Sequence, residues 1–485
     1  MNKDHPNILY IFADDWGYGD ISCLNPDSKI HTPCTDKLAE QGMTFTDAHS
    51  SSAVCTPSRY SVLTGRYCWR GPLKSSVLGG WDELLIEDDR MTVASLLRDK
   101  GYRTACIGKW HLGLGWHHNT QPPTRHNGFY EWNDDRIDVD FTKTLTKGPH
   151  TVGFDVSFII PASLDIVPYC FIENGHVHDL PMRHVEDSPR PAEYRGGPCA
   201  RGLQHETVLL EFTNRAEQFI ADHARESPDK PFFLYLPLPS PHTPHVPREP
   251  FQGTSECGAY GDYVVEHDWS IGRVLETLER SGLADDTLVI VTSDNGAHIR
   301  GQGMKADMPF DFEQQYGHRS NHIYRGQKTD AWDGGHRIPY IARWPGVIEP
   351  GSTCDHPICL TDLLATVAEL HGEDLPDDAG EDSLSTLPLM HQQQPGSGRQ
   401  AIVHHSGGGE FAIRQGNWKL IDCPGSGGWS MPPGKVPDDA PPRQLYNLDN
   451  DIEEQHNLIG QHPDVEQRLL TLLDQYKTNN RSVDR

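Results

Sequence analysis

Two short apolar runs, almost three hundred residues apart, each stop at a pair of oxygen-bearing side chains, and this repetition constrains the fold most strongly. Each pair directly follows its run: Asp14 and Asp15 after Asn7–Ala13, and Asp294 and Asn295 after Thr287–Ser293. Continuous apolar runs of this length are typical of strands buried on both faces of a parallel sheet. The carboxyl ends of such strands meet at one edge, where open α/β sheets bind their ligands. We therefore expect the four polar side chains to lie together.

Three carboxylates and one amide at this edge form an all-oxygen set. Like charges at short range disfavour one another unless a cation lies between them. Hard oxygen ligands select calcium or magnesium over zinc, and flexible carboxylate geometry suits calcium better. Turn or helix capping by the same residues is the alternative. The pattern predicts a calcium site, with magnesium as the second possibility.

Helical and strand patterns alternate through most of the chain. A helix is expected over residues 33–41, with Thr32 as its N-cap, and longer amphipathic helices are expected over 206–224 and 260–281. Apolar runs at 102–107, 231–236 and 340–344 predict further strands. This alternation predicts an α/β fold with a large, mostly parallel central sheet covered by helices on both faces.

The last quarter of the chain has a different pattern. Residues 373–399 are acidic and rich in Gln, Pro and Gly, and this composition predicts a linker. Short strand patterns and a final amphipathic helix over 464–476 follow, and they predict a small α+β subdomain with an antiparallel sheet. A chain of 485 residues is long enough for both parts. We expect a main domain over 1–375 and a C-terminal subdomain over 376–485.

Composition excludes several classes of partner. The net charge is −27, so nucleic acid and anionic membranes would be repelled. The sequence contains no run of 18 or more apolar residues, so no membrane span is expected. The eleven cysteines are scattered without a Cys-x-x-Cys pair, which favours free thiols over a disulfide framework or a zinc ribbon. The N-terminus enters a strand at once, which predicts a cytoplasmic protein, or a periplasmic or secreted one if a leader was removed.

The string Cys55-Thr56-Pro57-Ser58-Arg59 carries the most specific chemical signal. Alone, such a cysteine is typical of a small buried thiol near a turn. A helix expected over 60–63 would place Cys55 near a helix N-terminus, which favours an anion there. The string from Cys55 to Arg66 resembles the signature of the type I sulfatases, in the alkaline-phosphatase superfamily. In that family the cysteine is oxidised to formylglycine, so the resemblance implies a formylglycine-generating enzyme that acts on Cys55–Arg59.

Three further segments extend the resemblance, which covers most of the first 370 residues: Gly108-Lys109-Trp110-His111-Leu112-Gly113, His242 after a strand, and Lys328 in Arg-Gly-Gln-Lys. In an extended backbone, Lys109 and His111 would point the same way. The resemblance implies a catalytic set of six residues, namely Cys55, Arg59, Lys109, His111, His242 and Lys328. It also implies that one calcium ion is held by Asp14, Asp15, Asp294, Asn295 and the formylglycine at Cys55.

A hydrated formylglycine carries two hydroxyls, and this chemistry defines the implied mechanism. One hydroxyl, beside Arg59, would attack sulfur, and deprotonation of the other by His111 would expel sulfate. Lys109 and Lys328 would bind sulfate oxygens, and His242 would protonate the leaving alkoxide.

The substrate is predicted less directly. Residues 161–169 are similar to a stretch of bacterial galactosamine-6-sulfatase-like enzymes, which implies a sulfated galactose or N-acetylgalactosamine glycan or a small oligosaccharide. The candidate substrate-binding residues are Asp165, Arg300, His404 and His405. Two alternatives stay open: a phosphonate or phosphate ester hydrolase on the same scaffold, and an inactive sulfatase-like glycan-binding protein.

Overall fold

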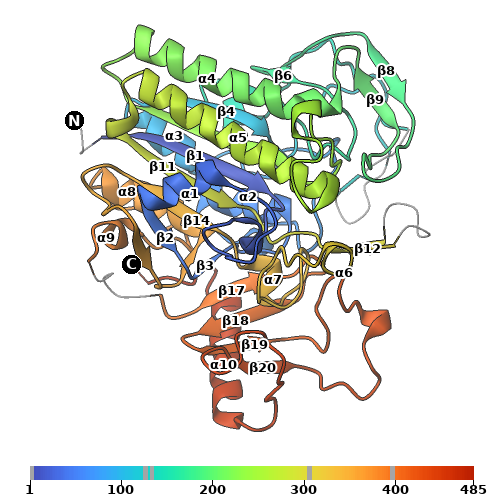
Figure 1. The fold of residues 1–485 in the computed structure, drawn as a ribbon, viewed down its shortest axis with the longest axis vertical. Coiled ribbons are helices and arrows are strands. Elements are labelled where there is room, and N and C mark those ends of the chain that lie inside the picture. The colour runs from blue at the N-terminus through green and yellow to red at the C-terminus, as the bar shows by residue number, and fades with distance from the viewer. Residues whose placement is uncertain (1–4, 124–128, 131–135, 303–308, 394–398, 485) are drawn as a thin grey trace.

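The computed structural model describes residues 5–123, 129–130, 136–302, 309–393 and 399–484, and a ten-stranded sheet forms its centre (Figure 1). The strands lie in the order β15 (Ser352–Cys354), β2 (Met43–Phe45), β14 (Tyr340–Arg343), β11 (Thr287–Ser293), β1 (Asn7–Asp14), β10 (Phe232–Pro241), β4 (Arg103–Lys109), β5 (Val156–Ile160), β6 (Ile172–Glu173) and β7 (His176–Val177). The five strands from β11 to β5 are mutually parallel, whereas antiparallel pairs flank them on both sides. The predicted mostly parallel sheet is confirmed.

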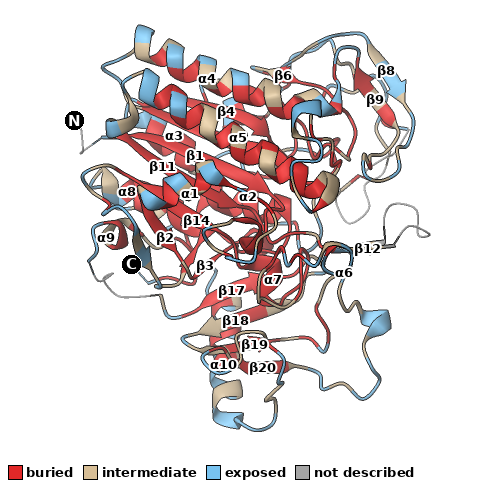
Figure 2. Ribbon diagram, in the orientation of Figure 1, coloured by how far each residue is buried: buried red, intermediate tan, exposed pale blue. Residues whose placement is uncertain are grey.

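The central strands are apolar because helices cover both faces of the sheet. All eight residues of β1 are buried, in register with β10 on one side and β11 on the other. The helices α1 (Pro33–Glu40), α4 (Val208–Glu226) and α5 (Gly258–Arg280) pack together on one face (Figure 1). The helices α2 (Cys55–Thr64), α3 (Val93–Asp99) and α8 (Leu363–Leu370) pack together on the other. Figure 2 shows the buried sheet and the exposed outer stripe of α4.

The N-terminus of α1 shows where local sequence was misleading. Thr32 occupies the N-cap position, as predicted, but its side chain makes no capping hydrogen bond. Asp268 on α5 accepts from the backbone N–H groups of Cys34 and Thr35 at 3.0 and 2.8 Å instead. A carboxylate from a neighbouring helix therefore satisfies donors that the sequence assigned to a local cap.

The C-terminal part is an antiparallel sheet covered by one helix, as predicted. Its strands are β17 (Ile402–His405), β18 (Phe411–Gln415), β19 (Trp418–Ile421) and β20 (Gln444–Asn447), in that order. Helix α10 (Pro463–Thr478) packs on β18 and β19. The apolar cluster beneath it also includes Tyr67 and Trp69, so this sheet shares its core with the first part of the chain.

Residues 379–390 of the predicted linker are packed against the protein, whereas most of 373–378 and all of 391–393 are exposed. Residues 381–383 are buried, and the short helix α9 (Leu387–Met390) contributes Leu389 and Met390 to the main apolar core. The division of the chain near residue 375 stays a prediction.

Shorter elements surround the sheet edge where the polar side chains gather. The strand β3 (Ala48–His49) pairs with β16 (Ile358–Cys359), β8 (Met182–Val185) with β9 (Gly197–Ala200), and β12 (Arg300–Gln302) with β13 (Pro309–Asp311). The short helices α6 (Phe312–Tyr316) and α7 (Asp333–His336) follow. All eleven cysteines are free thiols. Among the described helices, none has both the length and the apolar character needed to cross a membrane.

Candidate active site

The carboxyl ends of β1 and β11 bring four oxygen-bearing side chains together. Asp14 is the last residue of β1, and the chain turns sharply at Asp15, which has a φ of 63°. The Asp15 backbone N–H donates to Asp294 Oδ1 at 3.1 Å. Asn295 Nδ2 donates to Asp15 Oδ1 at 2.7 Å. The parallel pairing of the two strands therefore explains a cluster that is almost three hundred residues apart in sequence.

Three cations neutralise this acidic cluster. Arg59 Nη2 lies 2.7 Å from Asp294 Oδ2, Lys109 Nζ lies 2.6 Å from Asp14 Oδ2, and Lys328 Nζ lies 2.7 Å from Asp15 Oδ2. All these side chains are buried, and buried charges are tolerated only when they are paired and hydrogen-bonded. The site is thus a balanced set of three carboxylates and three cations.

Cys55 begins α2 against this set. Its side chain is almost fully buried, and Sγ donates to Asp14 Oδ1 at 3.3 Å. Burial, reinforced by the charge of Asp14, raises the pKa of the Cys55 thiol well above its usual value. Because the thiolate is the nucleophilic form of cysteine, an unmodified Cys55 would be a poor nucleophile here.

The donor set fits a hard divalent cation. Asn295 Oδ1 is buried and has no hydrogen-bond partner. Burial and the charge of Asp14 raise the pKa of Asp294 to about 7, although Arg59 opposes this shift. A divalent cation among these oxygens would satisfy the amide carbonyl and offset the repulsion between the carboxylates.

Two histidines approach the cluster from different loops. His111 follows β4 with a φ of 54°, so the assumption that extended backbone aligns it with Lys109 is wrong. Its Nε2 lies 2.8 Å from the Leu78 carbonyl, whereas its buried Nδ1 has no partner. His242 Nδ1 lies 2.6 Å from the Thr243 carbonyl, and its Nε2 lies 3.6 Å from Asp15 Oδ2. Burial lowers the pKa of both histidines, which favours neutral rings.

A cavity of about 490 Å³ opens above Cys55. Four predicted catalytic residues line it: Cys55, His111, His242 and Lys328. Asp165 also lines it and is held by Arg195, whose Nη1 lies 2.6 Å from Asp165 Oδ2. Other lining residues were missed from sequence because they lie in loops without a periodic pattern: Ser76, Val77, Ser163, Arg190, Glu193, Arg195, His298, Thr329 and Trp429.

Three predicted substrate-binding residues do not line this cavity. Arg300 is exposed and lines a separate depression beside Tyr324 and Arg325. His405 is buried with its ring against Phe411, at a centroid distance of 4.9 Å. His404 is buried in a cluster with His49 and His336. The neighbouring Gly407 and Gly408, rather than the histidines, line the cavity.

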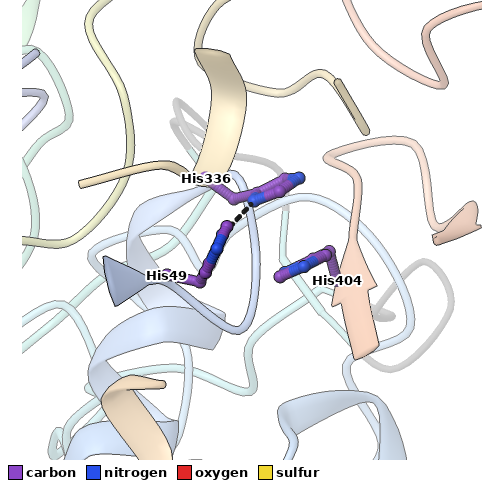
Figure 3. Close-up of side chains that lie close together, drawn as sticks. All are labelled: His49, His336 and His404. Carbon is purple, nitrogen blue, oxygen red and sulfur yellow. Dashed lines mark hydrogen bonds between the residues drawn. The ribbon is translucent and has the colours of Figure 1, made fainter. Parts of the chain in front are cut away.

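The cluster around His404 joins the two parts of the chain (Figure 3). His49 Nδ1 lies 3.1 Å from His336 Nδ1, and the rings of His336 and His404 stack at 3.6 Å with an angle of 7° between their planes. Lys419 Nζ lies 3.1 Å from His336 Nε2. Parallel stacked rings direct their lone pairs side by side rather than toward one point, and an ammonium lies against them. We therefore interpret the cluster as a buried hydrogen-bond network and not as a second metal site.

Comparisons with known proteins agree with this arrangement. The profile of the family described as Sulfatase matches residues 6–373. The N-acetylgalactosamine-6-O-sulfatase of Bacteroides thetaiotaomicron is 35% identical, with 99% of this chain and 94% of that protein covered. Human steryl-sulfatase is 32% identical, with 84% and 73% covered.

Solved structures give the same result for the fold. A structure described under the metabolism of glycosaminoglycans by Bacteroides thetaiotaomicron superposes with a TM-score of 0.83 and 34% identity, covering 98% of this chain and 100% of that one. A sulfatase from Pseudoalteromonas sp. superposes with a TM-score of 0.71 at 22% identity, covering 99% and 92%. The match over residues 6–373, together with relatives aligned over nearly the whole chain, establishes that this protein is a member of the sulfatase family, whose enzymes hydrolyse sulfuric esters.

Proposed function

We propose that this sulfatase removes a sulfate ester from a sulfated carbohydrate of the galactose or N-acetylgalactosamine type. The observation that carries the proposal is the cavity in which Cys55, His111, His242 and Lys328 face one space beside a balanced cluster of carboxylates and cations. The name of the relative from Bacteroides thetaiotaomicron supports the choice of sugar.

The proposal includes two groups that the chain would acquire, namely formylglycine at Cys55 and one calcium ion. Asp14, Asp15, Asp294 and Asn295, together with the modified residue 55, would hold the ion. The raised pKa of the thiol and the partnerless Asn295 Oδ1 support both groups. When present, formylglycine would supply a hydroxyl nucleophile and a route for release of sulfate, and calcium would withdraw charge from the sulfate oxygens.

The protein's own side chains account for charge and proton movements. Lys328 lines the cavity and would bind a sulfate oxygen. Lys109 was also expected to bind sulfate, but it pairs with Asp14 and does not line the cavity, so Lys109 and Arg59 would instead stabilise the acidic cluster. Because Nδ1–H of His242 donates to the Thr243 carbonyl, Nε2 is the atom that would deliver a proton to the leaving oxygen. It would do so from the cationic ring, which the charges of Asp15 and Asp14 favour. Since Nε2 of His111 is held by the Leu78 carbonyl, its Nδ1 is the atom that would accept a proton.

A maturation enzyme is the implied protein partner, and the burial of Cys55 sets when it can act. Cys55 is 2% exposed and lies within α2. We expect the maturation enzyme to modify a peptide covering residues 50–66 but not the folded protein with unmodified Cys55. Peptide mass analysis of position 55 measures both reactions. Equal rates of modification on peptide and folded protein would contradict this order of events.

Reaction class is tested with matched esters. We expect the enzyme, with formylglycine verified by mass analysis, to hydrolyse an aryl sulfate much faster than the corresponding aryl phosphate. A large preference for the phosphate would instead support the phosphate ester hydrolase. A panel of sugars sulfated at single defined hydroxyls then tests the substrate. No turnover across that panel, with formylglycine and calcium both verified, would support the glycan-binding alternative.

A further inference from the structure

Trp429 lies at the wall of the cavity with an unusual exposure. It belongs to the loop between β19 and β20, and 48% of its surface is exposed. Within the described residues, only Leu180 is a comparably exposed large apolar side chain. A ligand that packs on this indole would remove apolar surface from water, which is favourable.

The loop holds Trp429 in a fixed place beside the catalytic residues. Its backbone N–H donates to Thr329 Oγ1 at 2.8 Å, and Ser430 N donates to Asp330 Oδ1 at 3.1 Å. Gly428 packs so closely on Thr329 that a Cβ would overlap its backbone carbonyl. The indole also contacts the His298 ring at a centroid distance of 4.5 Å. Thr329, which follows Lys328, therefore holds the backbone that carries the Trp429 ring.

The distance from the indole to the reacting end of the cavity suits one sugar unit. Lys328 Nζ lies 6.0 Å from the centroid of the Trp429 ring. A pyranose has an apolar face of C–H bonds, which packs well on an indole, and polar hydroxyls around its edge. If the ester sulfate lies at Lys328, the ring of the same sugar reaches Trp429.

Asp165 supplies a polar partner in the same cavity. Its Oδ2 accepts from Arg195, but its Oδ1 has no hydrogen-bond partner and lies 4.0 Å from His242 Nδ1. Burial opposes ionisation, yet His242 and Arg195 lower the pKa of Asp165 to about 2, so the carboxylate only accepts hydrogen bonds. A hydroxyl of the substrate is a donor that fits this oxygen.

We propose that Trp429 and Asp165 form a pyranose-binding subsite, in which the indole packs on the apolar face of the sulfated sugar and Asp165 accepts one of its hydroxyls. This proposal rests on the proposed function. It adds the two residues that would favour a sulfated sugar ring over a flexible alkyl sulfate. A sulfatase with this subsite recognises the sugar itself, in addition to its sulfate.

The test compares two primary sulfate esters that differ in the ring. The enzyme, with formylglycine and calcium verified, is assayed on N-acetylgalactosamine 6-sulfate and on a straight-chain alkyl sulfate. Trp429→Ala should lower the ratio of kcat/KM between sugar and alkyl sulfate by about tenfold, mainly through KM for the sugar. Trp429→Phe should recover most of the ratio. Asp165→Asn should raise KM for the sugar, and the increase should vanish with the deoxy analogue that lacks the bound hydroxyl.

A matched tryptophan away from the cavity controls for general destabilisation. Trp269 on α5 is half-buried and packs on Phe251, so Trp269→Ala should keep the wild-type ratio. An unchanged ratio in Trp429→Ala would overturn the subsite alone. A wild-type enzyme that cleaves the alkyl sulfate but no sulfated pyranose would overturn the proposed function as well, and this distinguishes the two failures.

Discussion

Cys55 lies where an unmodified thiol has little reactivity. Cys55 is the first residue of α2, and its thiol donates a hydrogen bond to Asp14. Burial keeps the thiol protonated. The role of Cys55 could be predicted from sequence because the sulfatase signature around it is one contiguous string. Trp429 could not, because only the packing of its loop on Thr329 brings it to the cavity.

Replacement of Cys55 separates chemistry from stability. Cys55→Ala should abolish turnover of an aryl sulfate, since no group remains to attack sulfur. The free energy of unfolding should fall by only about 1 kcal/mol, because one small side chain and one weak hydrogen bond are lost. Thermal unfolding and steady-state rates measure the two effects. Turnover near the wild-type rate in this variant would exclude Cys55 as the source of the nucleophile.

The oxygen cluster gives a second prediction at the level of single residues. Chelation of the proposed calcium should abolish turnover and lower the melting temperature, because the buried carboxylates would lose a neighbouring cation. Asn295→Ala should weaken calcium binding by about tenfold or more in a calorimetric titration. Asn7 is a matched buried amide at the other end of β1, so Asn7→Ala should reduce stability without changing calcium affinity. Full activity in protein shown by elemental analysis to be metal-free would contradict the site.

The elements of the core follow from sequence more completely than the elements around the cavity. Apolar runs identified β1, β10 and β11, since strands buried on both faces leave a continuous apolar signal. The amphipathic spacing of α4 and α5 identified both helices to within two residues. The loops that supply Arg190, His298 and Trp429 have no such period, and contacts distant in sequence fix their shape.

Substitution of Gly428 tests how far the loop that carries Trp429 determines substrate affinity. Gly428→Ala should displace the loop that carries Trp429, because a Cβ would overlap the Thr329 carbonyl. We expect KM for a sulfated monosaccharide to rise by several-fold, with a small loss of stability of about 1 kcal/mol. Gly434 lies in the same loop and a Cβ there would meet open space, so Gly434→Ala is the matched control. Equal KM values for the two variants would mean that the close packing at Gly428 does not matter for binding.

At the scale of the whole molecule, a buried polar network connects the C-terminal sheet to β3 and α7. His404 on β17 meets His49 on β3 and His336 on α7 (Figure 3). Lys419 on β19 also contacts His336. Charged groups from both parts surround the histidines: Asp47, Asp333, Arg337, Arg414, Lys419 and Glu454. The strand pattern of residues 402–447 was readable from sequence, but this histidine network was not, because single histidines carry no periodic signal.

The network predicts that stability falls in mild acid. Burial lowers the pKa of His49 to about 4, and burial also lowers the pKa values of His336 and His404. The unfolded chain binds these protons below a pH of about 6.5 and the folded protein does not, so the free energy of unfolding falls as pH drops from about 6.5 toward 4. The shift of His49 alone corresponds to about 3 kcal/mol across that window. Glu454, whose pKa burial raises to about 7, acts in the opposite direction, but it is one group against three.

Melting temperatures between pH 7.5 and pH 5 measure this effect, and one substitution isolates the network from other buried histidines. His404→Phe keeps an aromatic ring on His336 but removes one group that resists protonation, so its stability should depend less steeply on pH than that of the wild type. His456 is a matched control, because its side chain is 81% exposed beside Asp451, and His456→Gln should keep the wild-type slope. If His404→Phe also keeps the full slope, the acid sensitivity arises from groups outside this network.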